Sequence, residues 1–539
     1  MSPIRSPRKT RTASPQRRWR QHAVASLCAL ALAMPAGWSP AMAQNALPAL
    51  GDTDSAEFTV GTEKKLGDEI MREIHADPDY VDDPLLLEYV ESVWQPLVAA
   101  ARSLGNITAD IDQRFAWEPF LVRDPSVNAF ALPGGFVGVH LGLIALTTTR
   151  DELASVLAHE MSHISQRHIA RSITGDSKRS LVGLAALLLG LVAASRSRNP
   201  DAMSAVISGT QAATIQGQLN FSRDVEREAD RVGFQVMTAA GFAPGGMAAM
   251  FEKMDQSSRL NDFGGFPYLR THPLTVDRIG EARARASARA ASANAAAPGA
   301  VLEHVVAQAR ARVLMDPRVD ALHRWQARDA DRAGSTAERL RAACESGLAS
   351  SMLRDWARAD AAFAAARALV RGGAGGSARA ERAIALMQTQ SLLDRGATAQ
   401  AAETMQPYAH DGSRPSLLLA AQTALLATPA VTPDNAALQA NAAALQTWVA
   451  VHADDSLAWT ALAQTWGRLG QPLRSIRAEA EARYALGDLL GAVDRLRAGQ
   501  RVARAGGPVD FIDASVLDSR LRTIEAQRKQ IAADQHATR

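Results

Sequence analysis

The chain has 539 residues, and at roughly 100 to 200 residues per domain this length excludes a single compact domain. Hydrophobic residues make up 47%, charged residues 21% and aromatic residues 5% of the chain, an ordinary globular composition that excludes both global disorder and a polytopic membrane protein. The formal net charge is only +3, and its basic excess comes from the N-terminal segment.

Residues 1–43 have the pattern of a secretory signal peptide. The first twenty residues hold seven basic and no acidic side chains, an apolar run follows from Ala23 to Met34, and Ala41-Met42-Ala43 forms an A-x-A cleavage site. A transmembrane anchor is the alternative, although it needs about 20 apolar residues. Cleavage would leave more acidic than basic groups, so we expect no binding to nucleic acid. It would also leave Cys344 alone, which excludes an internal disulfide.

A strand-like region follows from Phe120 to Val139, between segments of helical periodicity. Within it, Pro133-Gly134-Gly135 predicts a tight turn, so the residues around Asn128 are expected in one strand of a hairpin. The sequence therefore predicts a small sheet inside a mainly helical first half.

The next helix carries the clearest chemical motif. Thr149-Arg150-Asp151-Glu152 predicts a capping box, in which both side chains bond backbone N–H groups, and the helix should continue to about Ser172. On it lies His159-Glu160-Met161-Ser162-His163. Histidines four residues apart share one helix face, so both imidazoles can reach one zinc ion while Glu160 takes a proton from water.

This motif alone leaves a surface helix with two histidines as an alternative. The metzincin class would need glycine at 166 and histidine at 169, where the chain has Gln166 and Ile169, so that class is excluded. A third protein ligand must come from elsewhere.

An apolar run from Leu181 to Ala194 comes next, flanked by basic residues. As a helix it is too short to span about 30 Å of hydrocarbon. We expect an interfacial or substrate-covering hairpin that could contact the membrane surface peripherally, with a buried core helix as the alternative.

A further helix is expected to run from Glu226-Arg227-Glu228-Ala229-Asp230 to Gly241. Glu226 and Asp230 share a face, so one of them can bind the metal while the other orients a ligand histidine. Glu228 should point elsewhere and be solvated.

Composition changes again after Arg283. An alanine-rich stretch predicts a linker over 286–300, and from 301 to 510 Ala, Leu, Arg and Gln recur at helical spacing. We expect this half to be all α, with a C-terminal helix and tail over 511–539.

Part of this half resembles a tetratricopeptide unit, in which small and large residues interlock two helices. The matching residues are Gly347, Leu353, Asp355, Trp356, Ala359, Phe363 and Ala366. Weaker copies follow, and an unrelated Ala-rich bundle is the alternative. Neither alternative supplies a cluster of groups suited to chemistry.

Together these motifs resemble the gluzincin metallopeptidases of the HtpX and CAAX prenyl endopeptidase group. The resemblance spans about 128 to 278. Besides the zinc helix and Glu226 to Asp230, it rests on Asn128-Ala129-Phe130-Ala131-Leu132-Pro133-Gly134-Gly135, Ala240-Gly241-Phe242-Ala243-Pro244, and Thr271-His272-Pro273-Leu274 with Arg278. The patterns and the resemblance predict a mainly α protein, with an α+β peptidase domain at 44–285 followed by an all-α tetratricopeptide-like solenoid.

The resemblance implies one zinc ion per chain, bound by His159, His163 and Glu226. It implies Glu160 as the catalytic base and Asp230 as the residue that orients a ligand histidine.

The resemblance also implies that Asn128, Ala129 and Phe130 form an open edge strand, to which a substrate peptide adds. His272 either occupies the fourth zinc position and holds the enzyme inactive or stabilises the transition state. Arg278 matches in spacing without an assigned role.

We therefore expect a zinc endopeptidase of the periplasm that degrades misfolded or stalled outer-membrane proteins and helps their assembly. Its partners would be unfolded polypeptides and the outer-membrane protein assembly machinery. The repeat domain would dock the substrate or this machinery. The alternative is a mostly latent peptidase that acts as a chaperone or adaptor.

Overall fold

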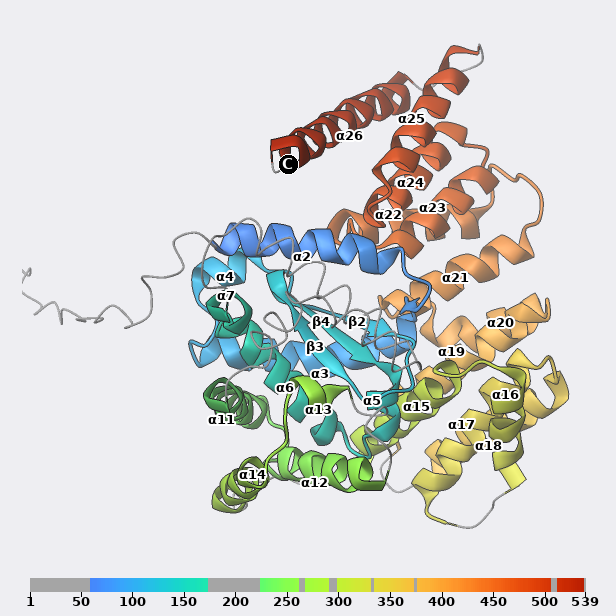
Figure 1. Cartoon of the computed structure of the whole chain (residues 1–539). Helices are drawn as coiled ribbons and strands as arrows, with labels where there is room; N and C mark the ends of the chain where they lie inside the picture. The colour runs from blue at the N-terminus through green and yellow to red at the C-terminus, as the bar shows by residue number, and fades with distance from the viewer. Residues whose placement is uncertain are drawn as a thin grey trace, which may run out of the picture. The chain divides into compact units, whose positions relative to one another are not determined.

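The computed structural model describes residues 59–172, 223–260, 267–289, 298–330, 334–372, 376–505 and 511–537 (Figure 1). The signal peptide expected at 1–43 and the apolar run at 181–194 lie outside these residues, as does the central part of the linker expected at 286–300. None of the described helices is both long enough and apolar enough to cross a membrane.

The first half combines helices with one small sheet. Its helices are α2 (Val60–His75), α3 (Pro84–Ser103), α4 (Ala109–Arg114), α5 (Leu141–Leu146), α6 (Arg150–Ser165), α7 (His168–Ser172), α11 (Arg223–Ala239), α12 (Gly245–Leu260), α13 (Tyr268–Thr271) and α14 (Val276–Arg289). Its strands are β1 (Tyr80–Val81), β2 (Glu118–Val122), β3 (Ala129–Leu132) and β4 (Phe136–His140), with the short 3-10 turn η1 (Pro133–Gly135).

The strand order is β1-β2-β4-β3, which puts β3 at one end of the sheet among the described residues. β2 and β4 are parallel, while β3 runs antiparallel to β4 with Phe130 opposite Gly138. The predicted hairpin is therefore present, and its turn uses Gly134 and Gly135 at φ values of +79° and +93°. Side chains are strained at such angles, so glycine suits both positions.

Helix α6 is the central element of the first half and is buried along almost its whole length. It contacts α3, α11, α12 and β3, so every face of the helix is covered. The predicted capping threonine is present, because the Thr149 side chain accepts a hydrogen bond from Glu152 N at 3.2 Å. The Glu152 carboxylate reaches one residue further than predicted and accepts from Thr148 N at 2.7 Å.

The helix expected to run to about Ser172 is broken. α6 ends at Ser165, and α7 starts at His168 after Arg167, whose φ of 52° is left-handed. Arg167 donates to Glu63 of α2 at 3.0 Å, and Glu63 is buried. This tertiary ion pair holds a backbone conformation that periodicity within the segment cannot predict.

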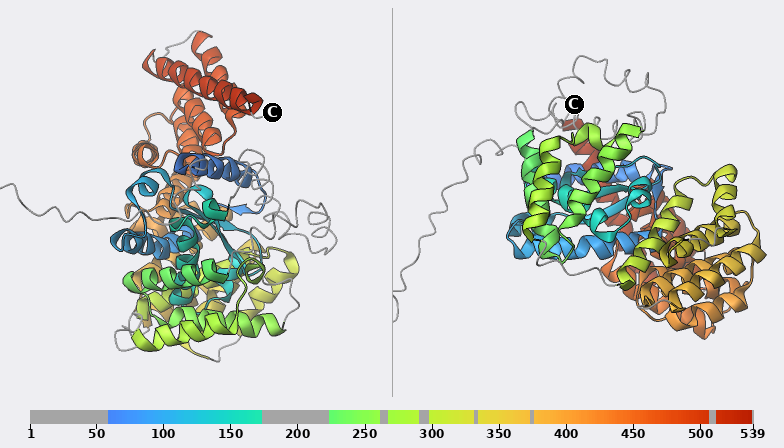
Figure 2. Two further views of the ribbon diagram at one scale, coloured as in Figure 1. Left: turned by 60° about the vertical axis from the view of Figure 1, so that its left-hand side comes forward. Right: turned by 90° about the horizontal axis from the view of Figure 1, so that it is seen from below.

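The second half is entirely helical in its described residues, which confirms the predicted fold class. Its helices are α15 (Pro298–Leu314), α16 (Val319–Gln326), α17 (Thr336–Met352), α18 (Trp356–Gly372), α19 (Ala378–Asp394), α20 (Thr398–Met405), α21 (Arg414–Ala427), α22 (Ala436–Val451), α23 (Ser456–Arg468), α24 (Pro472–Ala485), α25 (Leu489–Arg504) and α26 (Phe511–Ala537), with the 3-10 turns η4 (Ala327–Ala330) and η5 (Gln406–Tyr408). Figure 2 gives two further views of these helices.

Successive helices in this half pack against each other, as in the contacts of α17 with α18 and of α23 with α24. Gly347 of α17 illustrates why small residues are needed, because a Cβ there would lie 2.9 Å from the Phe363 ring of α18. This interlock is the one predicted for a tetratricopeptide unit, while the repeat assignment itself and the domain boundaries stay predictions.

Helix α15 joins the two halves. It contacts α3 and α5, and its residues Ala307 and Ala311 belong to the same core cluster as the α6 leucines. Its buried His304 lies 3.0 Å from Thr147 O through Nε2. The first helix after the predicted linker is therefore part of the core of the first half.

Candidate metal centre

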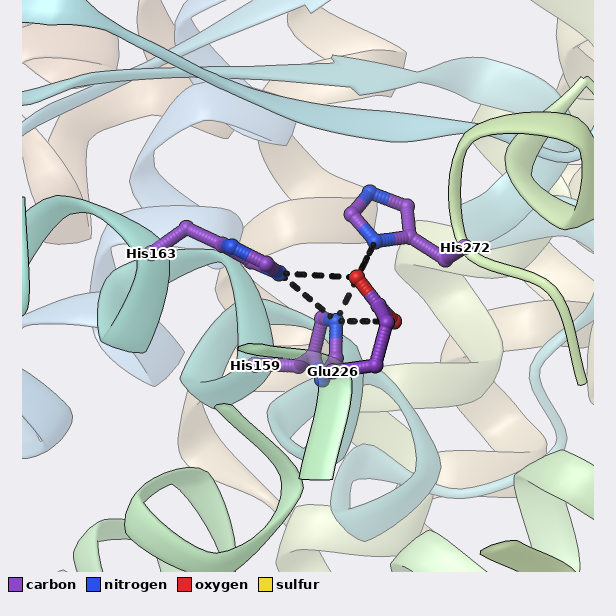
Figure 3. Close-up of side chains that lie close together, drawn as sticks. All are labelled: His159, His163, Glu226 and His272. Carbon is purple, nitrogen blue, oxygen red and sulfur yellow. Dashed lines mark hydrogen bonds and ion pairs between the residues drawn. The ribbon is translucent and has the colours of Figure 1, made fainter. Parts of the chain in front are cut away.

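Four buried side chains converge in the first half (Figure 3). His159 and His163 come from α6, Glu226 comes from α11, and His272 directly follows α13. One ligand atom from each lies within 4.8 Å of all the others, so the group could hold a metal ion. Site residues that the sequence predicted in three separate segments therefore lie together in the structure.

The distances inside this cluster suit a tetrahedral ion. His159 Nε2 lies 3.0 Å from His163 Nε2, 3.3 Å from His272 Nδ1 and 3.5 Å from Glu226 Oε2. Ligand bonds of about 2.0 to 2.1 Å in tetrahedral arrangement separate donor atoms by about 3.3 Å. Imidazole nitrogens and a carboxylate oxygen are also the ligand types that zinc binds. The spacing and the donor set both fit a metal ion.

Helix α11 reaches the cluster because it lies very close to α6. A Cβ on Gly233 would lie 3.0 Å from Ala158 O and 3.1 Å from His159 N, which is closer than most Cβ contacts, so glycine favours this separation. The close contact brings Glu226 and Asp230, one turn apart on α11, alongside His159.

Asp230 supports His159 from behind. Its Oδ1 lies 3.0 Å from His159 Nδ1, and Arg278 donates to both Asp230 oxygens at 2.7 and 2.8 Å. Burial would raise the pKa of Asp230, but the hydrogen bonds from Arg278 and His159 outweigh it and lower that pKa. Asp230 therefore stays ionised next to the imidazole, as a residue that orients a ligand should.

Arg278, which had no assigned role, links several parts of the site. Besides Asp230, its guanidinium lies 2.9 Å from Glu226 Oε2 and donates to Pro273 O at 2.8 Å. It therefore compensates two buried carboxylates and fixes the loop that carries His272.

Glu160 lies between the cluster and the sheet. Its Oε2 accepts a hydrogen bond from Ala131 N of β3 at 3.0 Å, while Oε1 lies 3.6 Å from His272 Nε2 and accepts no hydrogen bond from the described residues. Burial raises the pKa of Glu160, and this effect outweighs the lowering by His272 and His159. A carboxylate with a raised pKa is suited to accept a proton near neutral pH.

The predicted substrate strand is only partly accessible. β3 ends the sheet, but Ala129 is fully buried, whereas Asn128, Phe130 and Ala131 are half-buried. The Phe130 ring packs across Gly138, where a Cβ would lie 2.3 Å from it.

Glu228 makes a contact that the sequence did not predict. Its side chain is partly exposed, in line with the expected solvation, but its Oε2 also lies 3.2 Å from His168 Nε2. His168 in turn lies 2.9 Å from His163 through the two Nδ1 atoms. The break after α6 carries His168 to this position, so helical spacing within one helix gave no signal for the contact.

Tyr268 was missed for a different reason. Its ring centroid lies 4.7 Å from that of His272, and its buried hydroxyl has no hydrogen-bond partner among the described residues. A single tyrosine four residues before a histidine carries no recognisable pattern.

The fold and the site define a class of protein. Two histidines and a glutamate between them on one helix, with a glutamate from a second helix, are the arrangement of a gluzincin-type metallopeptidase. Residues 90–286 match the model of peptidase family M48, which supports this class for that part of the chain.

Individual relatives extend the comparison. The chain is 35% identical over 258 residues to the beta-barrel assembly-enhancing protease of Escherichia coli (strain K12), an alignment that covers 46% of this chain and 49% of that protein. It is 36% identical over 247 residues to the protein of the same name from Yersinia pestis, covering 46% and 48%. It is also 29% identical over 230 residues to the mitochondrial metalloendopeptidase OMA1 of Saccharomyces cerevisiae, covering 41% and 61%.

The chain spans about half the length of the assembly-enhancing proteases that it matches. The resemblance to metallopeptidases that was expected from the motifs is confirmed by these matches.

Proposed function

We propose that this chain is a zinc-dependent endopeptidase of the periplasm that degrades misfolded or stalled outer-membrane proteins. The observation that carries the proposal is the position of Glu160, which lies between a buried His-His-Glu cluster and the end strand of the sheet. His159, His163 and Glu226 would hold one zinc ion per chain. Zinc bound there would polarise the peptide carbonyl and make water more acidic.

The protein side chains prepare this chemistry. Asp230 accepts the Nδ1 proton of His159, which leaves the Nε2 lone pair facing the cluster. Glu160 accepts a proton from the attacking water and delivers it to the leaving amine. The hydrogen bond from Ala131 N holds the Glu160 carboxylate beside the strand on which the substrate would lie.

A substrate in extended conformation would add to β3, where Phe130 and Ala131 are the more accessible residues. This mode favours an unfolded segment, because such a segment can extend along β3 without first leaving a sheet of its own. The names of the relatives support substrates from β-barrel assembly, and the helical second half would dock these substrates or the assembly machinery.

The second candidate is a mostly latent peptidase that acts as a chaperone or adaptor. One observation favours it: His272 Nδ1 lies 2.9 Å from Glu226 Oε1 and 3.3 Å from His159 Nε2, inside the cluster. An imidazole there would take the position that water needs.

The test measures zinc content and cleavage of an unfolded protein such as casein by the full-length chain. We expect one zinc per chain, and Glu160→Gln should abolish cleavage while zinc content and Tm stay nearly unchanged. Equal cleavage by the variant and the wild type would refute the role of Glu160.

His272→Ala separates the two candidate functions. Release from latency predicts faster cleavage with zinc retained. A tenfold or larger fall in the cleavage rate, about 1.4 kcal/mol in barrier height, would instead make His272 part of the catalytic machinery.

A further inference from the structure

Three polar side chains line the side of His163 that faces away from the cluster. His163 Nδ1 lies 2.9 Å from His168 Nδ1, and His168 Nε2 lies 3.2 Å from Glu228 Oε2. Arg171 donates to the same Glu228 oxygen at 3.1 Å. His168 is buried, while Glu228 and Arg171 extend towards the surface.

The protons in this chain of contacts can be assigned from chemistry. A metal ligand binds through a lone pair, so His163 Nε2 must be unprotonated and its Nδ1 must carry the hydrogen. That N–H can donate only if His168 Nδ1 accepts, and the proton of His168 then lies on Nε2, directed at Glu228. Each polar atom has a complementary partner in this arrangement. The reverse arrangement would point an N–H into the cluster and an imidazole lone pair at a carboxylate.

The turn that carries His168 is fixed independently of the metal cluster. Arg167 adopts a left-handed backbone conformation and is tied to buried Glu63 at 3.0 Å. α7 begins at the next residue, so this ion pair sets the direction in which the His168 ring leaves the backbone.

We propose that His168 is a positioning residue for metal binding: it accepts the Nδ1 proton of His163, and Glu228 and Arg171 hold it in the tautomer that can do so. The inference rests on the proposed function, because it needs a metal at the cluster. His159 and His163 are then supported differently, the first by the ionised carboxylate of Asp230 and the second by a neutral imidazole that is itself held by a carboxylate.

The experiment compares three substitutions at one position in the full-length protein. Zinc affinity is measured by competition with a chromophoric chelator, and the Tm of the metal-free protein is measured alongside. The asparagine Oδ1 in His168→Asn lies as many bonds from the backbone as the lost Nδ1, so it can accept the His163 proton. The amide in His168→Gln lies one bond further out and reaches towards Glu228 instead.

We expect His168→Ala and His168→Gln to weaken zinc binding about 10- to 100-fold, and His168→Asn to restore most of that loss. If His168 only packed, the effect of each substitution would follow the volume of the new side chain. We therefore expect the Tm values of the metal-free forms not to follow the order of the zinc affinities. A His168→Asn variant that binds zinc as weakly as His168→Ala would overturn the proposal.

Glu228→Ala provides a second test at a site that is partly exposed and therefore tolerant of change. It should weaken zinc binding in the same direction, because the Nε2 proton of His168 loses its acceptor. Glu252→Ala is the matched control, since it removes an exposed ion pair with Arg283 that contacts no residue of the metal cluster. Equal zinc affinity in Glu228→Ala, Glu252→Ala and wild type would overturn the proposal. Wild-type protein that binds no zinc would overturn the proposed function itself.

Discussion

Arg278 forms ion pairs with two carboxylates of the candidate site, and no sequence motif predicted these contacts. It is buried, it donates twice to Asp230, and it lies 2.9 Å from Glu226 Oε2. Removing one partner of a buried ion pair leaves an uncompensated charge in a poorly solvated environment. The stability of the peptidase domain should therefore depend on this one guanidinium.

We predict that Arg278→Met lowers the free energy of unfolding by about 3 to 5 kcal/mol. Methionine keeps an aliphatic side chain at this position but leaves two buried carboxylates without their positively charged partner. Denaturant unfolding of the metal-free protein measures this loss. Arg283→Met is the control on the same helix, since Arg283 pairs with Glu252 at the surface and its loss should cost less than about 1 kcal/mol. Similar losses in both variants would show that the buried pair carries no special weight.

Spacing rules predicted which residues lie side by side only where both residues belong to the same helix. His159 and His163 lie four residues apart on α6, and Glu226 and Asp230 four apart on α11, so each pair shares a face as expected. The contact of His168 with Glu228 joins different helices across a break, and no local rule predicts it. The roles of these residues remain proposals, whereas their convergence is observed.

The packing of α11 on α6 determines the geometry of the centre. Gly233 allows the two backbones to approach, and the carboxylates of Glu226 and Asp230 follow from that separation. The sequence predicted both helices and the start of α6 at its threonine cap. It could not predict how closely they pack, because this depends on which residues of one helix face the backbone of the other.

Gly233→Ala should separate the two helices. Its Cβ would meet three backbone atoms of Ala158 and His159 at 3.0 to 3.1 Å, and backbone cannot give way as a side-chain end can. We predict a loss of about 1 to 3 kcal/mol in stability, as for other overpacked cores, together with weaker zinc binding. Denaturant unfolding and zinc competition measure the two effects.

Gly280→Ala is the matched control, because it makes the same change inside helix α14 with no atom within 4 Å of the new Cβ. Alanine is the better helix former, so this variant should be more stable by up to about 1 kcal/mol. If Gly233→Ala behaved like Gly280→Ala in both measurements, close packing of α11 would not determine the geometry of the centre.

The two halves of the described chain are joined by buried polar contacts as well as by ion pairs. Arg310 of α15 donates to Asp83 at 2.6 Å, and Arg414 of α21 donates to Asp82 at 2.6 Å. The acidic partners lie just before and at the start of α3, so helices from distant parts of the second half meet the same short segment. The composition changes predicted two halves, but they gave no indication that the halves share this segment.

His304 lies in the core of this junction. Its Nδ1 is 2.5 Å from the Tyr89 hydroxyl of α3, and its Nε2 is 3.0 Å from Thr147 O, so a neutral imidazole satisfies both partners. Burial lowers the pKa of His304 to about 4, and the hydrogen bond to Thr147 only partly offsets this effect. The nearby charged groups of Glu152, Lys253 and Arg150 carry both signs.

The direction of the resulting pH dependence follows from the two states. In the unfolded chain His304 takes up a proton as the pH falls through about 6.5, whereas in the folded protein it stays neutral down to about 4. Between these values the unfolded state binds more protons, so acidification favours unfolding. The resulting loss in the free energy of unfolding is on the order of 3 kcal/mol. This loss is complete near pH 4 and absent above about pH 7.

We therefore predict that His304→Gln, which cannot titrate but can still form hydrogen bonds, is less sensitive to acid than the wild type. The free energy of unfolding of each protein is measured with denaturant at pH 7 and pH 5, and the difference between the proteins cancels the titration of all other groups. Wild type should lose about 2 kcal/mol more than the variant over this range. His323→Gln in α16 is the control, because His323 is exposed and its Nδ1 lies 3.3 Å from Gln326 Oε1 on the same helix. If His304→Gln and His323→Gln lost stability equally on acidification, the junction would not depend on a neutral His304.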